Sequence, residues 1–199
     1  MADIINNIGL GEAYATVALW WAAKPDDGNN WVGNYIDTDT IVVGELIGSN
    51  VGGAELRADI SVAYDFESPA NAHPIIDSST TAFYIRSLEK FIIKGFEIDA
   101  TGSSGSAIRA GSFEDCDLEV HNCRIKGGKN AVHTNRALAK IHLKNCVITE
   151  ASETGISGSS AGVGASHCVI ANCNTSNTNY RGGVQSNAGS VFDSVVCYN

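Results

Sequence analysis

A short pattern recurs five times in the C-terminal half of the chain. Each copy starts with a residue that tolerates a left-handed backbone, continues with a small or apolar residue, and has Ile or Val two positions further on. The copies occupy residues 95–98, 122–125, 145–148, 167–170 and 193–196, at intervals of 27, 23, 22 and 26 residues. Repetition with a period of this length is typical of one supersecondary unit that stacks on itself. This repeat constrains the architecture more than any other feature of the chain.

The first residue of each copy predicts a sharp bend. Gly, Asn, His and Asp enter the left-handed region of the backbone at the lowest cost, so such a column between short apolar runs marks a corner between two strands. The predicted ladder of corners consists of Gly95, Asn122, Asn145, His167 and Asp193.

Apolar residues on both sides of the corner predict a buried face. Before the corner they alternate with period two, as in Phe91 and Ile93 or Leu118 and Val120. After the corner, two columns lie two residues apart and therefore point to the same side of a strand. The predicted core stack contains Phe96, Cys123, Cys146 and Cys168, together with Ile98, Ile125, Ile148 and Ile170.

A third strand is visible in each repeat. It is marked by the pairs 107–108, 131–132, 155–156 and 183–184, at intervals of 24, 24 and 28 residues. Gly-, Ser-, Asn- and Thr-rich segments of variable length separate the strands, which a solenoid permits because loops leave the stack without breaking it. Helical periodicity is absent, so the repeat predicts a coil of three short parallel strands. Earlier candidates at 41–43, 60–62, 75–76 and 81–85 bring the expected number of coils to six or seven.

The N-terminal segment differs from the repeats. Residues 16–24 predict a short helix with Thr16 as its N-cap and Pro25 beyond its end. Val17, Trp20 and Trp21 share one face of this helix, which suits a cap on the first coil better than an aromatic ligand platform. The expected organisation is a cap over residues 1–40, including Trp31 and Tyr35, and a solenoid over residues 41–199, which together form one domain.

These features resemble the right-handed parallel β-helices of the pectate-lyase-like superfamily. Asn122 and Asn145 match the asparagine ladder of that superfamily, and the inward Cys and Ile columns match its core stacks. The opening at residues 8–17 is similar to the Gly-rich lead and Tyr-x-Thr helix start of many phage and bacterial β-helix proteins. The resemblance covers most of the chain and implies an all-β, single-stranded right-handed parallel β-helix with a short N-terminal capping helix. It implies little about activity, because one fold hosts many functions.

Composition narrows the possible partners. The net charge is −9 and no basic cluster occurs, which argues against nucleic acid and against anionic membranes. No run of 18 apolar residues is present, and the first residues lack the charged lead and apolar stretch of a secretory signal. We therefore expect synthesis in a host cytoplasm, without a signal peptide and without a membrane anchor.

The cysteines favour free structural thiols. Three of them lie in one inward column, where Cys behaves as a small hydrophobe, and three stacked thiols cannot all pair. No C-x-x-C or C-x-x-H spacing occurs, so no metal site and no cofactor is expected. Cys116, Cys173 and Cys197 lie outside the column and receive no assigned role.

The sequence contains only one fragment of a known catalytic motif. Residues 124–126 resemble the Arg-Ile-Lys motif of polygalacturonases, but the accompanying Asn-Thr-Asp, Asp-Asp and Gly-His-Gly motifs are missing. Glu97 and Arg124 fall in one outward column and predict a surface ion pair. His133 is interpreted as a lone surface histidine. The remaining carboxylates are scattered, and a catalytic role would require Glu97, Asp99, Asp115 and Asp117 to converge.

The expected function is therefore non-enzymatic, with no catalytic residue assigned. The most specific hypothesis is a phage virion component: a capsid decoration or cement protein that contacts the major capsid protein. The coil that starts at Asp193 has no visible polar cap, so a partner or a second copy, with a trimer as the guess, is expected to cover it. The candidate interface residues are Trp20, Trp21, Trp31, Cys197 and Tyr198. The alternative is a tailspike-like module that binds or cleaves bacterial polysaccharide.

Overall fold

The structure is a computed structural model that describes residues 2–25, 27–41, 43–68, 71–79, 81–110, 116–134, 139–174, 182–192 and 195–198. Side chains are described over these ranges except at 44–52, 86–89, 159–161, 186–192 and 195–198. The ladder position Asp193 and the carboxylates Glu114 and Asp115 lie outside the described residues. Cys197 and Tyr198 are described only in their backbone.

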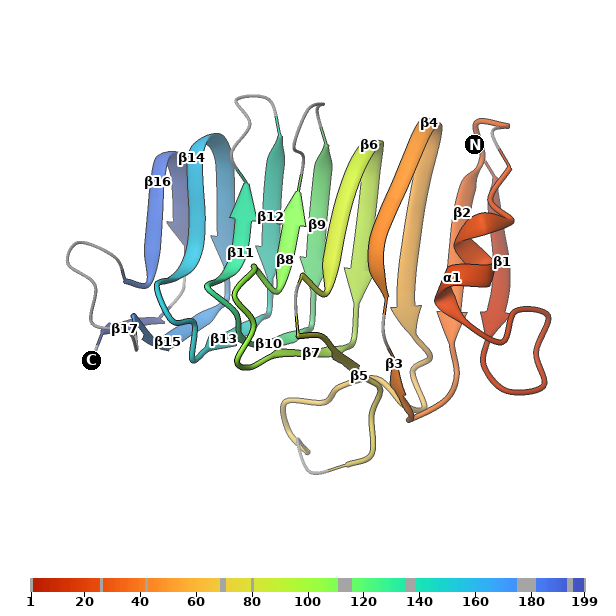
Figure 1. The fold of residues 1–199 in the computed structure, drawn as a ribbon, viewed down its shortest axis with the longest axis horizontal. Coiled ribbons are helices and arrows are strands. Elements are labelled where there is room, and N and C mark those ends of the chain that lie inside the picture. The colour runs from red at the N-terminus through yellow and green to blue at the C-terminus, as the bar shows by residue number, and fades with distance from the viewer. Residues whose placement is uncertain are drawn as a thin grey trace.

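The chain winds into a right-handed parallel β-helix, as predicted (Figure 1). Its strands form two parallel sheets that run along the stack. The seven-stranded sheet contains β3 (Thr40–Ile41), β5 (Ile75–Asp77), β7 (Glu97–Ala100), β10 (Arg124–Gly127), β13 (Val147–Thr149), β15 (Val169–Cys173) and β17 (Val195–Tyr198). The ten-stranded sheet contains β1 (Asp3–Ile8), β2 (Asn30–Tyr35), β4 (Gly44–Ala58), β6 (Phe83–Lys94), β8 (Ile108–Ala110), β9 (Asp117–His121), β11 (Asn130–Thr134), β12 (Lys140–Lys144), β14 (Thr154–Ser166) and β16 (Val184–Phe192).

From β4 onward, each coil contributes to the ten-stranded sheet in one of two ways. In two coils, separate strands fill the first two positions: β8 then β9, and β11 then β12. In the coils of β4, β6, β14 and β16, one long strand fills both positions (Figure 1). The register links the two forms, because the first part of β6 pairs with β8 and its last part pairs with β9. The predicted three strand positions are therefore present, and two of them are continuous in four coils.

The core is a set of stacked columns between the sheets. Parallel pairing places Ile125 beside Ile98 on one side and Ile148 on the other, and Ile170 follows. All eight residues of the predicted core stack are at most 1% exposed. Burying a side chain of this kind stabilises the fold by roughly 1.5–3 kcal/mol. The alternation read from the sequence thus gave the correct buried face.

Helix α1 (Val17–Ala22) covers the first coil. The Thr16 hydroxyl accepts a hydrogen bond from the Leu19 backbone N–H at 3.2 Å, so Thr16 is the N-cap that the sequence predicted. The Trp20 ring stacks on the Trp31 ring at 6.4 Å between centroids, and the Trp21 ring meets the Phe91 ring edge-on at 5.7 Å. The helix therefore closes the apolar end of the stack.

Two differences from the predicted N-terminal region follow. Trp20 and Trp31 are buried, so they belong to the core and offer no surface to a partner; Trp21 is only partly exposed. Within residues 1–40, β1 and β2 also join the ten-stranded sheet, with Trp31 paired in register to Ala54. The large apolar side chains exposed in the segment from residue 10 to α1 are instead Leu10 and Leu19.

One segment leaves the stack between β4 and β5 (Figure 1). Its backbone returns to the corner at Gly95, where the Tyr64 N–H donates to the Gly95 carbonyl at 2.8 Å. The Tyr64 ring also packs edge-on against Phe66 and against His73. We call the described parts of residues 59–74 the corner loop, because they cover the corner that precedes β7.

Candidate functional site

The predicted ladder of corners is confirmed at four of its five positions. Gly95, Asn122, Asn145 and His167 have positive φ values of 79°, 53°, 51° and 55°. The Asn145 amide donates to the Asn122 side-chain oxygen at 3.2 Å, which is one rung of the asparagine ladder. These residues shape the backbone and present no arrangement of groups suited to catalysis.

The cysteine column is a set of buried thiols. Cys116, Cys123, Cys146, Cys168 and Cys173 are free and buried. The thiols of Cys123, Cys146 and Cys168 each donate to the carbonyl two residues earlier, at 3.2 to 3.4 Å. Burial raises the pKa of the Cys123 thiol to about 12, which keeps it protonated and unreactive. This column stabilises the core.

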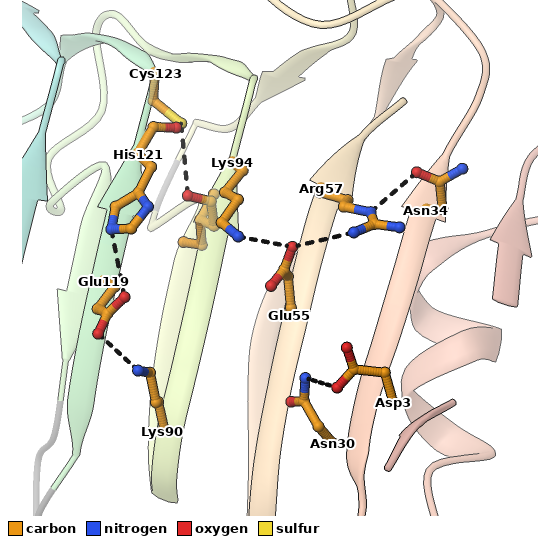
Figure 2. Close-up of polar contacts among 11 residues, drawn as sticks. Asp3, Asn30, Asn34, Glu55, Arg57, Lys90, Lys94, Glu119, His121 and Cys123 are labelled. Atoms are coloured by element: carbon orange, nitrogen blue, oxygen red, sulfur yellow. Dashed lines mark hydrogen bonds and ion pairs between the residues drawn. The ribbon is translucent and has the colours of Figure 1, made fainter. Parts of the chain in front are cut away.

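The outer face of the ten-stranded sheet carries a network of charges (Figure 2). Glu55 on β4 accepts from Lys94 on the next coil at 3.0 Å and lies 3.7 Å from Arg57. Glu119 on β9 lies 2.7 Å from Lys90 and 3.4 Å from His121. Each glutamate thus contacts a lysine on a neighbouring coil and a basic residue on its own strand, Arg57 for Glu55 and His121 for Glu119.

These pairings change the acidity of the groups involved. Burial disfavours the charged form of Glu119, but the hydrogen bond and charge of Lys90 outweigh it and lower the pKa of Glu119 below its ordinary value. The hydrogen bond to Glu119 likewise raises the pKa of Lys90. Both groups are therefore ionised over the physiological range, and Glu119 is unsuited to act as a general acid.

The outer face of the seven-stranded sheet holds a second cluster. The Oε2 of Glu97 on β7 lies 3.0 Å from the Nε2 of His73 in the corner loop. The same oxygen lies 3.4 Å from a guanidinium nitrogen of Arg124 on β10. The other ring nitrogen of His73 lies 2.6 Å from the carbonyl of Asn71, which is also an acceptor. The predicted Glu97–Arg124 pair is present, but Glu97 is buried beneath the corner loop rather than exposed.

Two residues along β7, a similar arrangement surrounds Asp99. Its carboxylate accepts from the Thr101 backbone N–H at 2.8 Å and lies 3.8 Å from Lys126. Burial raises the pKa of Asp99, but the hydrogen bonds from Thr101 and the charge of Lys126 bring it below the ordinary value. Arg124 and Lys126 thus both serve as ion-pair partners, and Ile125 between them points into the core, as the repeat frame predicts.

The predicted carboxylates converge only in part. Glu97 and Asp99 share one face of β7, and Asp77 on β5 lies beside Asp99 in register. Asp117 is in the other sheet, on β9, and Asp115 lies outside the described residues. Among the described side chains, no group of three or more His, Cys, Asp or Glu is placed to hold a metal ion.

A polar pocket of about 340 Å³ lies on the outer face of the ten-stranded sheet, over β8, β11 and the first residues of β14 and β16. His133, expected to be a lone surface histidine, is half-buried in this pocket. Arg109 precedes it by one coil, and the Arg109 guanidinium lies 5.0 Å from the centre of the Tyr84 ring. The sequence did carry a signal for this row, because Arg109 and His133 each follow the apolar residue of the third-strand column by one position.

The chain was compared with protein-family models, with curated proteins and with solved structures. No protein-family model matches the chain, and no curated protein matches it. A solved structure, the pectin methylesterase from Aspergillus niger, is similar with 9% sequence identity and a TM-score of 0.45, covering 97% of this chain and 84% of that one. At this level the similarity says nothing about activity. Within the described part of the chain, no helix has the length and apolar character needed to cross a membrane.

Proposed function

We propose that the protein is a non-enzymatic structural component of a phage virion, a decoration or cement protein that binds the major capsid protein. The observation that supports the non-enzymatic part is the pairing of four outward carboxylates. Glu55, Glu97, Asp99 and Glu119 are each held by at least one cation on a neighbouring coil. Sugar-cleaving sites instead need two carboxyl groups that face a shared gap of roughly 5–10 Å, one of them with a raised pKa.

The surface that supports binding of another protein is at the α1 end of the stack. Leu10 is 87% exposed and Leu19 is 56% exposed, and Ile5 on the outer face of β1 is 56% exposed. Large apolar side chains that are exposed in one region of a molecule are typical of protein–protein contact sites. In the proposal, these three side chains are buried against the capsid protein, and the cap formed by α1 holds them in place.

The test begins with gradient-purified virions of the phage that encodes the chain, analysed by mass spectrometry. The proposal expects the protein in the particle, and its absence from purified particles would overturn the virion role. Purified protein added to particles that lack it should raise the temperature at which they release DNA. The double variant Leu10→Ser, Leu19→Ser should lose this binding, whereas Ile60→Ser, which removes a 96% exposed side chain elsewhere, should not.

A second candidate function is favoured by the acids on the seven-stranded sheet. Asp77, Glu97 and Asp99 lie on neighbouring strands of one outer face, which suits a tailspike-like polysaccharide module. Incubation with bacterial surface polysaccharides, followed by analysis for shortened chains, distinguishes the two. Product formed by the wild type and abolished in Asp99→Asn would replace the structural proposal with the enzymatic one.

A further inference from the structure

The pocket over β8 and β11 is built from one row of outward residues. The parallel registers place Tyr84, Arg109, His133, Ser157 and Gln185 side by side on five successive coils. One rim is formed by residues 104–106, which precede β8, and another by Lys129 and Asn130 at the start of β11. The rims and the row from Arg109 to Gln185, without Tyr84, line a pocket of about 340 Å³, which is in the range of about 300–1,000 Å³ for small-molecule sites.

The lining has an unusual charge for a chain with a net charge of −9. It includes Arg109, Lys129 and His133, while the other described lining residues are Ser, Thr, Asn, Gln and Gly, with no carboxylate among them. Lys129 lies 3.6 Å from Glu153, which is outside the lining. Arg109 also lines the pocket, and no carboxylate of the described part of the chain forms an ion pair with it.

Two polar atoms of residues that line this pocket are buried without a partner among the described residues. They are the Nε of Arg109 and the Nδ1 of His133, which are neighbours across the β8–β11 pairing. An Arg Nε–H is always a donor, and a buried donor without an acceptor is unfavourable. The Tyr84 ring supports the guanidinium from one side and so limits its freedom to turn towards solvent.

His133 responds to the same surroundings. Burial, and next the positive charge of Arg109, lower the pKa of His133, while a hydrogen bond with the Ser157 backbone raises it slightly. Lys129 adds a further lowering effect. An anion in the pocket would offset the charges of Arg109 and Lys129.

We propose that the Arg109–His133 pocket binds a small oxyanion, a phosphate or a carboxylate group on a polar molecule. The planar Arg109 guanidinium provides the two-point contact that such groups favour. Gln185, Asn130 and Ser157 provide further hydrogen bonds around a polar ligand. This site is on the opposite sheet from the acids of β7, so it is independent of the virion role and of the polysaccharide alternative.

Titration of the intact protein with inorganic phosphate and, separately, with citrate tests this inference, with uncharged glucose as a control. NMR signals of the histidine rings report the position, and calorimetry reports the affinity. We expect one of the two anions to saturate at concentrations of about 10 mM or less and to shift the His133 ring signals selectively. Phosphate alone, citrate alone, or both would each identify the preferred group. No saturation by either, or saturation by glucose, would overturn the proposal.

Variants separate the pocket from general attraction to positive charge. Arg109→Gln should weaken binding by at least about tenfold, and Arg109→Lys, which keeps the charge but loses the planar fork, should weaken it by a few-fold. Lys140→Gln makes the same charge change at an exposed position of β12 that does not line the pocket, and should leave binding unchanged. Equal loss in Lys140→Gln and Arg109→Gln would overturn the assignment. Circular dichroism melts establish that each variant is folded. If Arg109→Gln does not fold, Arg109→Lys still tests the contact between the guanidinium and the anion.

Discussion

Glu150 adopts a left-handed backbone with φ of 61° at the bend that follows β13. The register places it in a column with Gly127, at φ 76°, and Asn172, at φ 52°. This column is a second ladder of corners, at the end of the seven-stranded sheet's strands rather than before them. Gly and Asn suit such a position, but Glu does not, because its Cβ is strained there. The Glu150 carboxylate is 3.7 Å from Lys126 and its side chain is 45% exposed, so the ion pair contributes little to stability.

The strain at Glu150 predicts a stabilising substitution. Glu150→Gly should raise the free energy of unfolding by about 0.5–1 kcal/mol relative to Glu150→Ala, because only Gly removes the Cβ. Both variants lose the ion pair with Lys126, so their difference isolates the backbone effect. Urea unfolding followed by fluorescence of the buried tryptophans measures it. An Ala variant as stable as the Gly variant would show that the bend at residue 150 is unstrained.

Helix α1 and β2 fit together through the absence of one side chain. A Cβ placed on Gly33 would lie 2.7 Å from the Cδ1 of Ile8 and 2.7 Å from the Trp20 ring. Trp20 is fully buried at this point and stacks on Trp31, so the ring has no free direction in which to move. The position of the cap therefore depends on a glycine in a strand, where glycine is otherwise unfavourable.

Gly33→Ala is accordingly expected to loosen the cap. The overpacking should lower the free energy of unfolding by about 1–3 kcal/mol and change the near-ultraviolet circular dichroism of the tryptophans. Gly162→Ala is the matched control, because among the described residues a Cβ on Gly162 meets only the Cγ of Lys140, at 4.0 Å. The control should stay within about 0.5 kcal/mol of the wild type. A Gly33→Ala variant as stable as the control would mean that α1 does not pack as described.

The elements that could be predicted from the sequence are those that repeat once per coil. The Ile98 and Cys123 columns were predictable because stacking forces every coil to offer the same face, so the pattern appears several times. The corner loop could not be predicted in this way. His73 contacts Glu97 from a segment that leaves the stack, and no repeat marks it. The long strand β14 was also missed, because its Gly- and Ser-rich centre is typical of a loop, yet β16 pairs with both of its ends.

The site was less predictable than the fold for a related reason. A core column needs only side-chain size, whereas an ion pair or a pocket depends on which outward side chains meet across coils. Lys90 reaches Glu119 diagonally rather than Asp117, its direct partner in register. Such contacts depend on side-chain rotamers and on loops that leave the stack. Neither can be predicted from the spacing of residues in the sequence.

At the scale of the whole molecule, the pKa shifts of several groups act in the same direction. Hydrogen bonds from Asn34 and Ser61 lower the pKa of Asp59 to about 2, and the pKa values of Asp99 and Glu119 are lowered by their partners. Burial lowers the pKa values of His121 and His133, assisted for His121 by Lys94 and Lys144 and opposed by Glu119. In every case the unfolded chain holds its proton at a higher pH than the folded chain does.

The stability of the protein should therefore fall on acidification in two stages. Between about pH 7 and 5 the two histidines bind protons more readily in the unfolded chain, and between about pH 4 and 2 the carboxylates do so. Because the unfolded state binds more protons in both ranges, the free energy of unfolding increases with pH throughout them. Urea unfolding at a series of pH values gives this profile.

His121→Gln combined with His133→Gln should flatten the first stage only, and Asp59→Asn should reduce the second only. A free energy of unfolding that rises from pH 7 to 5 would mean that protonated histidines are favoured in the fold, against the burial that surrounds them.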